Sequence, residues 1–133
     1  MARVSLSIQT EYPIFSVDYA FQRIGGKYKG RILWALSKHL VLRYGELNRE
    51  MSDINTKMLT QTLKELETDN LIHRKMYPQV PPKVEYSLTE TGKELILFIQ
   101  YSVDWGYKKW QMTHWNNFHF QEHKTAFLFF FMW

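Results

Sequence analysis

The segment from Ile54 to Asn70 constrains the fold of this chain more than any other. Its leucines recur at the spacing of an α-helix, so one stripe of the segment faces a core. These leucines are Leu59, Leu63 and Leu66. Asn55 stands where an N-cap is expected, and Asn70 tolerates the left-handed backbone that often ends a helix. We therefore predict a helix over residues 55–69.

The outward face of this helix carries short hydroxyls, an amide and two ammonium groups in its first half, whereas its acidic residues lie toward the other end. Such a mixture can contact phosphates and base edges together. The candidate contact residues are Thr56, Lys57, Thr60, Gln61 and Lys64. A solvated helix surface has the same composition, so the neighbouring segments must decide between the two interpretations.

The segment before this helix predicts a partner for it. Residues 45–51 place Leu47 and Met51 at helical spacing, and Ser52-Asp53 is typical of a turn. Two helices joined by a short turn, the second with a polar outer face, form the helix-turn-helix pattern.

After residue 70 the hydrophobic period changes from helix to strand. Residues 71–77 and 84–88 predict two strands, and the prolines between them forbid ladder hydrogen bonds and mark a hairpin tip. A basic hairpin directly after the second helix is a wing, with Arg74, Lys75 and Lys83 as its candidate contact residues. Arg74 could instead pair with Glu85 across the hairpin, and charge on an edge strand also discourages aggregation.

The expected fold class is therefore mainly α with a small β-hairpin wing (α+β), a winged helix-turn-helix. We expect one domain over residues 1–133: an N-terminal arm at 1–13, helices and wing at 14–88, and a C-terminal helix with an aromatic tail at 89–133. Within the arm, alternating apolar residues suggest a short strand. They are Val4, Leu6 and Ile8. The apolar run 95–110 and the aromatic tail exceed what one small domain can bury, so the terminal helices are expected to form a homodimer interface.

The helix expected at 27–39 opens with three cations, Lys27, Lys29 and Arg31. Cations at a helix N-terminus oppose its macrodipole. A nearby phosphate would relieve that repulsion, but a simply solvated basic cluster would give the same pattern.

The composition sets broad limits on function. The 133 residues carry a net charge of +4, which favours polyanionic partners only mildly. They contain no cysteine, which excludes disulfides, thiol catalysis and thiol redox sensing and fits a cytoplasmic protein. No apolar run reaches the roughly eighteen residues of a membrane-spanning helix, so no membrane partner is expected.

With these segments in place, the chain resembles the HxlR-type winged-helix transcription regulators of bacteria and archaea. The resemblance covers about residues 15–110 and is most specific in the run Pro-Pro-Lys-Val-Glu-Tyr-Ser-Leu-Thr at 81–89. The other matching segments are 24–28, 43–47, 57–61 with 63–67, and 77–80. The resemblance implies a DNA-binding homodimer that regulates a nearby promoter, with helix 55–69 in the major groove and hairpin 71–88 alongside it.

The chain departs from the family pattern at several places. Family members commonly carry a Cys-Pro pair where this chain has Phe15-Ser16, so thiol sensing is not implied here. Ser52-Asp53 replaces a turn that is often Pro-Gly, and Asn70 replaces a usual glycine; both are tolerable turn chemistry. The tail from Trp115 to Trp133 matches no part of the family known to us.

No set of residues points to catalysis, a metal or a cofactor. His119 and His123 are spaced four apart and follow His114, but no carboxylate spacing or second histidine-rich element supports a metal site. No nucleophile–base pair or glycine-rich phosphate loop is present, so an enzyme is not expected.

Three functions remain open at this stage. The first is a dimeric, sequence-specific regulator that binds a double-stranded DNA operator, and the basic residues of the helix and hairpin favour it. The alternative is a winged-helix protein-interaction adaptor with weak DNA binding. The third elaborates the first with an apolar small-molecule effector, bound by aromatic residues that include Trp34, Tyr101 or Trp105.

Overall fold

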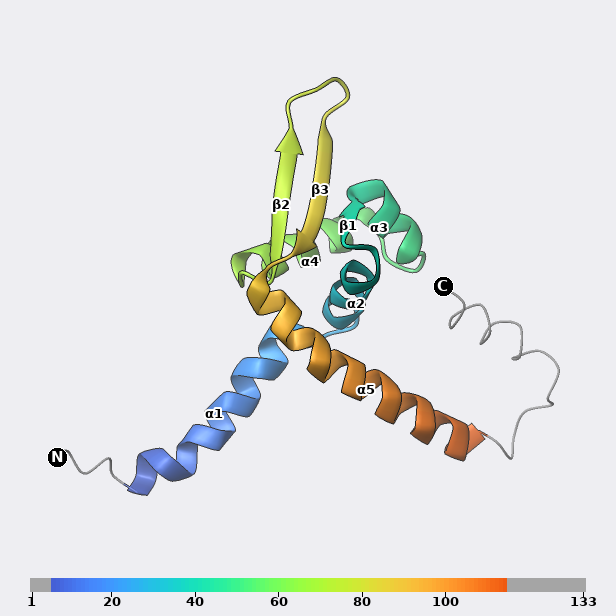
Figure 1. Ribbon diagram of the computed structural model, residues 1–133. Coiled ribbons are helices and arrows are strands. Elements are labelled where there is room, and N and C mark those ends of the chain that lie inside the picture. The colour runs from blue at the N-terminus through green and yellow to red at the C-terminus, as the bar shows by residue number, and fades with distance from the viewer. Residues whose placement is uncertain (1–5, 115–133) are drawn as a thin grey trace. The chain divides into compact units, whose positions relative to one another are not determined.

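The computed structural model describes residues 6–114, and within that range the chain forms five helices and one three-stranded sheet (Figure 1). The elements are α1 (Leu6–Ile24), α2 (Lys29–His39), β1 (Val41–Arg43), α3 (Tyr44–Glu50), α4 (Thr56–Thr68), β2 (Ile72–Tyr77), β3 (Lys83–Leu88) and α5 (Glu90–His114). The chain divides into two compact units within α5, after Ile99. The first unit contains the helix-turn-helix and the sheet.

The sheet is antiparallel, with β3 between β1 and β2. In the hairpin, Ile72 pairs with Leu88 at the base and Tyr77 with Lys83 at the far end. The strands expected at 71–77 and 84–88 are confirmed to within a residue. The hairpin extends away from α2 and α4 and ends in the proline-containing loop (Figure 1).

The core of the first unit lies between α2, α3, α4 and the base of the hairpin. The stripe predicted on α4 is fully buried, and it is completed by leucine and isoleucine side chains from the neighbouring elements. These core residues include Ile32, Leu33, Leu36, Leu47, Leu59, Leu63, Leu66 and Leu71. Burying each such side chain contributes about 1.5–3 kcal/mol, so this contact fixes which face of α4 remains outside.

The ends of α4 and the start of α5 follow the predicted signals. The Asn55 side chain accepts a hydrogen bond of 2.8 Å from the Met58 backbone nitrogen, which caps α4. Asn70 has a φ of 57°, the left-handed conformation that turns the chain into β2. Thr89 accepts a 2.9 Å hydrogen bond from the Gly92 nitrogen and so caps α5.

The short strand expected in the N-terminal arm is wrong over the described part of that segment. Residues 6–13 belong to α1, which continues without interruption to Ile24. Extending a helix adds one hydrogen bond for each residue that is fixed, whereas a lone strand has no partner. Val4 lies outside the described residues.

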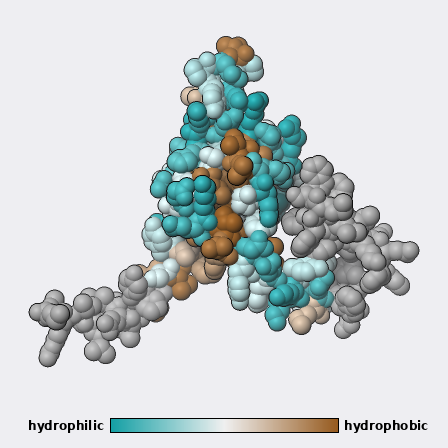
Figure 2. Space-filling view, in the orientation of Figure 1, coloured by the Kyte–Doolittle hydropathy of each residue, from teal (hydrophilic) through white to brown (hydrophobic). Residues whose placement is uncertain are grey.

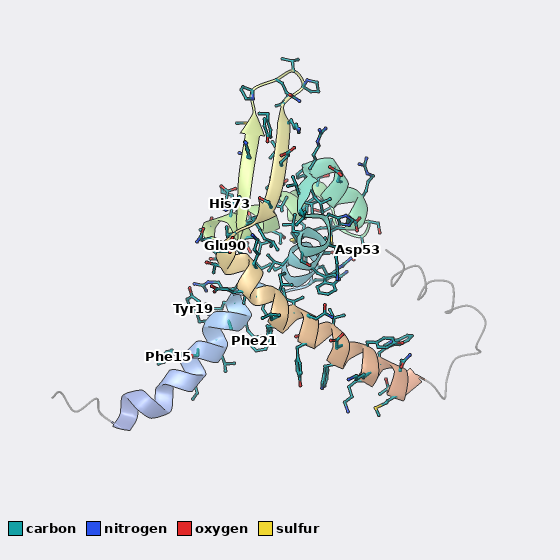
Figure 3. All side chains as sticks on the ribbon, viewed as in Figure 1. Phe15, Tyr19, Phe21, Asp53, His73 and Glu90 are labelled. Carbon is teal, nitrogen blue, oxygen red and sulfur yellow. The ribbon has the colours of Figure 1, made fainter. Side chains whose placement is uncertain are left out.

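Helices α1 and α5 leave large apolar side chains exposed. On α1, Phe15 is 65% exposed, Tyr19 63% and Phe21 56% (Figure 3). On α5, Leu97 is 81% exposed. Over residues 6–114, neither these helices nor any other is long and apolar enough to cross a membrane.

Gly92 supports the junction of α4, β2 and α5 because only a hydrogen fits there. A Cβ at this position would collide with the backbone carbonyl oxygen of Leu71, whereas a Cβ at Gly45 in α3 would meet nothing within 4 Å. We expect Gly92→Ala to lower the free energy of unfolding by about 1–3 kcal/mol. Gly45→Ala should raise it by up to about 1 kcal/mol through helix propensity. Urea denaturation measures both, and equal stability of the two variants would contradict the packing described here.

Candidate nucleic-acid interface

The polar residues predicted on α4 share one exposed face of the helix. Lys57, Gln61 and Lys64 follow one another at one-turn spacing, and all three are exposed. Thr56 and Thr60 are exposed beside them. Because the leucine stripe occupies the opposite side, the structure brings all five residues together on the surface.

Tyr44, the first residue of α3, holds the N-terminal half of α4. Its hydroxyl donates to the Thr56 carbonyl oxygen at 3.1 Å and lies 3.0 Å from the Thr60 hydroxyl. The Thr60 side chain is therefore already engaged within the protein. Sequence reasoning missed Tyr44, since no local pattern signals a contact between residues that only the fold brings together.

A groove of about 450 Å³ runs between α4 and the hairpin. Lys64 and Glu67 line it from the helix and Arg74 lines it from β2, and Tyr44 and Tyr86 are also part of its lining. Across the described residues 6–114, the side chains of Lys57, Lys64 and Arg74 make no hydrogen bond or ion pair. These cations are available to a polyanion without breaking any contact.

The hairpin separates the three predicted wing residues onto two faces. Arg74 pairs in register with Tyr86, and Lys75 pairs with Glu85. Side chains of directly paired residues share a face, and successive residues alternate. Arg74 therefore faces the groove, while Lys75 and Lys83 lie on the opposite side. The alternative pairing of Arg74 with Glu85 is wrong for the same reason.

On that opposite face, the Tyr77 side chain contacts two lysines and a glutamate. The ammonium groups of Lys75 and Lys83 lie 4.8 and 4.7 Å from the centre of its ring. Lys83 also pairs with Glu85 at 2.9 Å, and the Tyr77 hydroxyl donates to Glu85 at 3.1 Å. The hydrogen bond from Lys83 holds the pKa of Glu85 below its usual value. The Lys83 ammonium, a candidate contact group, is thus already engaged within the hairpin.

The loop that joins the strands presents apolar surface at its tip. Val80 is 100% exposed there, and Figure 2 shows the hydrophobic colour at the tip above hydrophilic flanks. Residues 78–82 contain no charge. The charged part of the hairpin is therefore its stem.

The basic opening of α2 is neutralised by carboxylates of the helix-turn-helix. Asp53, in the turn before α4 (Figure 3), accepts two hydrogen bonds from Arg31 at 2.7 and 3.0 Å and pairs with Lys27 at 3.2 Å. Lys29 pairs with Glu65 of α4 at 3.1 Å. Acidic side chains, rather than a phosphate, balance this cluster. Arg31 first, and Lys27 second, hold the pKa of Asp53 far below its usual range.

A comparison with protein families identifies the architecture. The profile described as HxlR-like helix-turn-helix matches residues 23–114. The chain belongs to this family. It is 48% identical over 91 residues to an uncharacterized HTH-type transcriptional regulator of Methanothermobacter thermautotrophicus, covering 68% of this chain and 69% of that protein. It is also 48% identical over 89 residues to the uncharacterized regulator YdzF of Bacillus subtilis, covering 67% of this chain and 82% of that protein.

Solved structures agree with this assignment. The redox regulator HypR in its reduced form is similar with a TM-score of 0.71 at 38% identity, covering 74% of this chain and 97% of that chain. The expected family and the winged helix-turn-helix fold are therefore confirmed. His119 and His123 lie outside the described residues, and residues 6–114 contain no group of three or more potential metal-binding side chains.

The ion pairs of Asp53 predict a pH dependence of stability. Because folding lowers the pKa of Asp53, its contribution to stability is complete above the ordinary value of 3.8 and is lost as the pH falls from there toward the lower folded-state pKa. The free energy of unfolding of Asp53→Asn should therefore fall less steeply than that of the wild type between pH 5 and about pH 2. Urea denaturation at a series of pH values measures this, and parallel curves would contradict it.

Proposed function

We propose that this chain is a homodimeric, sequence-specific transcriptional regulator that binds double-stranded operator DNA. In this proposal α4 enters the major groove and the β2–β3 hairpin lies alongside as a wing. The observation that carries the proposal, within residues 6–114, is that Lys64 and Arg74 lie unpaired in one groove while Lys57 is exposed and unpaired on the polar face of α4. The relatives named above are regulators of the helix-turn-helix type, which supports the same role.

The exposed groups of α4 suit both parts of DNA recognition. Lys57 and Lys64 can neutralise phosphates and release their counterions, which supplies affinity without sequence preference. The amide of Gln61 can pair bidentately with the exposed edge of adenine, which supplies specificity. Binding to a chromosomal operator would place the protein in the cytoplasm.

The proposed homodimer uses the exposed faces of the terminal helices. Phe15, Tyr19 and Phe21 give α1 a surface that a second copy could cover, and Leu97 adds to it on α5. A two-fold dimer would present two copies of α4 to successive major grooves on one side of the duplex. The expected operator is therefore a palindrome with half-sites about one helical turn apart.

The signal that such a regulator senses differs from that of its structural neighbour. HypR is described as a redox regulator, whereas these 133 residues contain no cysteine. A thiol switch is therefore unavailable to this chain. We propose that any effector is an apolar small molecule rather than a thiol-reactive one.

Substitutions on α4 should separate base contacts from phosphate contacts. Gln61→Ala should cost about 1–3 kcal/mol on the operator and relax the preference at one base pair. Lys64→Ala should weaken binding to all duplexes alike and reduce the salt slope by about one unit. Both variants would be titrated at several salt concentrations on a sequence selected from a random pool and on its scrambled form.

Lys93→Ala is the matched control, because Lys93 pairs with Glu90 at the start of α5 and does not line the groove. It should leave both affinities unchanged. If the wild-type protein selects no sequence and the α4 variants bind every duplex as it does, the adaptor function replaces the regulator.

The dimer is tested separately. Analytical ultracentrifugation at micromolar concentration should give the mass of a dimer, and Phe15→Asp should shift the equilibrium toward monomer because a carboxylate would be desolvated in the interface. Lys38→Asp on α2 serves as the control for a charge change. A wild-type protein that sediments as a stable monomer would rule out the proposed assembly.

A further inference from the structure

The Gln61 side chain is exposed, yet it is not free. Its amide nitrogen donates to the Glu65 carboxylate at 3.0 Å, one helical turn further along α4. Glu65 is in turn held by Lys29 of α2 at 3.1 Å. The Lys29 side chain is only 16% exposed and also donates to the Gln22 carbonyl oxygen at 3.3 Å. This series of contacts therefore begins at Lys29, which is anchored on α2, and ends at Gln61 on the polar face of α4.

The chemistry of this chain of contacts fixes which way the Gln61 amide points. An ionised carboxylate can only accept hydrogen bonds, so Glu65 must meet the NH₂ end of the amide and never its oxygen. A glutamate is ordinarily ionised at neutral pH, and the hydrogen bond from Gln61, followed by that from Lys29, lowers the pKa of Glu65 further. The amide is thereby held in one of its two orientations.

This orientation leaves a defined pair of groups for a ligand. One N–H of the amide is used by Glu65, while the second N–H and the carbonyl oxygen remain available. One donor beside one acceptor is the pattern that complements N7 and N6 of adenine in the major groove. Thymine offers only an acceptor and guanine only acceptors at that edge, so neither uses both groups.

We infer that Glu65, held by Lys29, is a positioning residue that presets the Gln61 amide to read adenine. This inference rests on the proposed function, because it requires α4 to lie in the major groove. Glu65 would therefore contribute to sequence specificity although its negative charge repels DNA. Its charge lowers the affinity of the protein for every duplex, while its hydrogen bond to Gln61 increases the preference for duplexes with adenine at the contacted position.

The pair can be tested first in the free protein by ¹⁵N-resolved NMR of side-chain amides. One Gln61 amide proton should resonate downfield of those of Gln79, an exposed residue of the hairpin loop. Glu65→Gln should abolish the difference, because a neutral amide at 65 can donate as well as accept and admits both orientations of Gln61. Gln61 resonances that do not respond to Glu65→Gln would overturn the inference.

The second arm measures discrimination on DNA. Glu67→Gln is the matched control, since Glu67 is exposed on the same helix and loses the same charge, but lines the groove beside Lys64 instead of bonding to Gln61. Both variants should bind a scrambled duplex more tightly than the wild type, and by a similar factor. Only Glu65→Gln should lose about tenfold or more of the preference for adenine over the other bases at one operator position. Lys29→Met removes the ion pair of Glu65 without altering α4, and this variant should lose part of the adenine preference.

The outcomes separate this inference from the proposed function. A wild-type protein that selects no sequence from a random pool overturns both together. If the wild type selects a sequence, but Glu65→Gln keeps its adenine preference or Glu67→Gln loses it equally, the inference alone is overturned. A selective loss in Glu65→Gln, with the NMR change in the free protein, supports it.

Discussion

Burial of the α4 leucine stripe is the contact on which the rest of the structure depends. Leu59 and Leu66 are 0% exposed and Leu63 is 2% exposed, so the helix cannot rotate about its axis without exposing them. The position of the apolar stripe on a helix determines the rotation of that helix about its own axis relative to the core. The commitment of one face to the core therefore also selects Lys57, Gln61 and Lys64 for the surface. The polar face of α4 is set by hydrophobic packing before any charge contributes.

Charge then refines what packing has fixed. The turn before α4 is tied to the start of α2 through Asp53, and the middle of α4 is tied to α2 through Glu65. Such exposed ion pairs contribute little to stability individually. Their geometric effect is larger, because a bidentate contact from Arg31 restrains the approach of the turn as well as its distance. The basic start of α2 is therefore a brace for the helix-turn-helix rather than an anion site.

Much of the fold was predictable from sequence because its signals are local. The α4 stripe, the Asn55 cap, the left-handed Asn70 and the prolines of the hairpin loop each act over a few residues, and each is confirmed. The N-terminal strand was wrong because a short alternation cannot be told from the start of a helix that continues beyond it. The candidate contact residues on α4 also followed from sequence, since they are the complement of the buried stripe.

The partners of those residues were beyond sequence reasoning. Tyr44, Lys29 and Arg31 reach α4 or its turn only through the fold, and no spacing in the chain encodes these approaches. The two faces of the hairpin illustrate the same limit. The sequence shows that Lys75 and Lys83 are basic, but it does not show the strand register, which directs both side chains toward Tyr77 and away from the groove.

Whether a cation is engaged or free matters more here than how many cations there are. A net charge of +4 is modest, and several of the basic residues near the helix-turn-helix and hairpin are held by carboxylates or an aromatic ring. They include Lys27, Lys29, Arg31, Lys75 and Lys83. A paired cation must give up its partner before it can bind a phosphate, which offsets part of the gain. Lys57, Lys64 and Arg74 carry no such cost. Lys64 and Arg74 lie in one groove with Glu67, and Lys57 is exposed on the face of α4 that also carries the Gln61 amide, the only amide side chain within that helix.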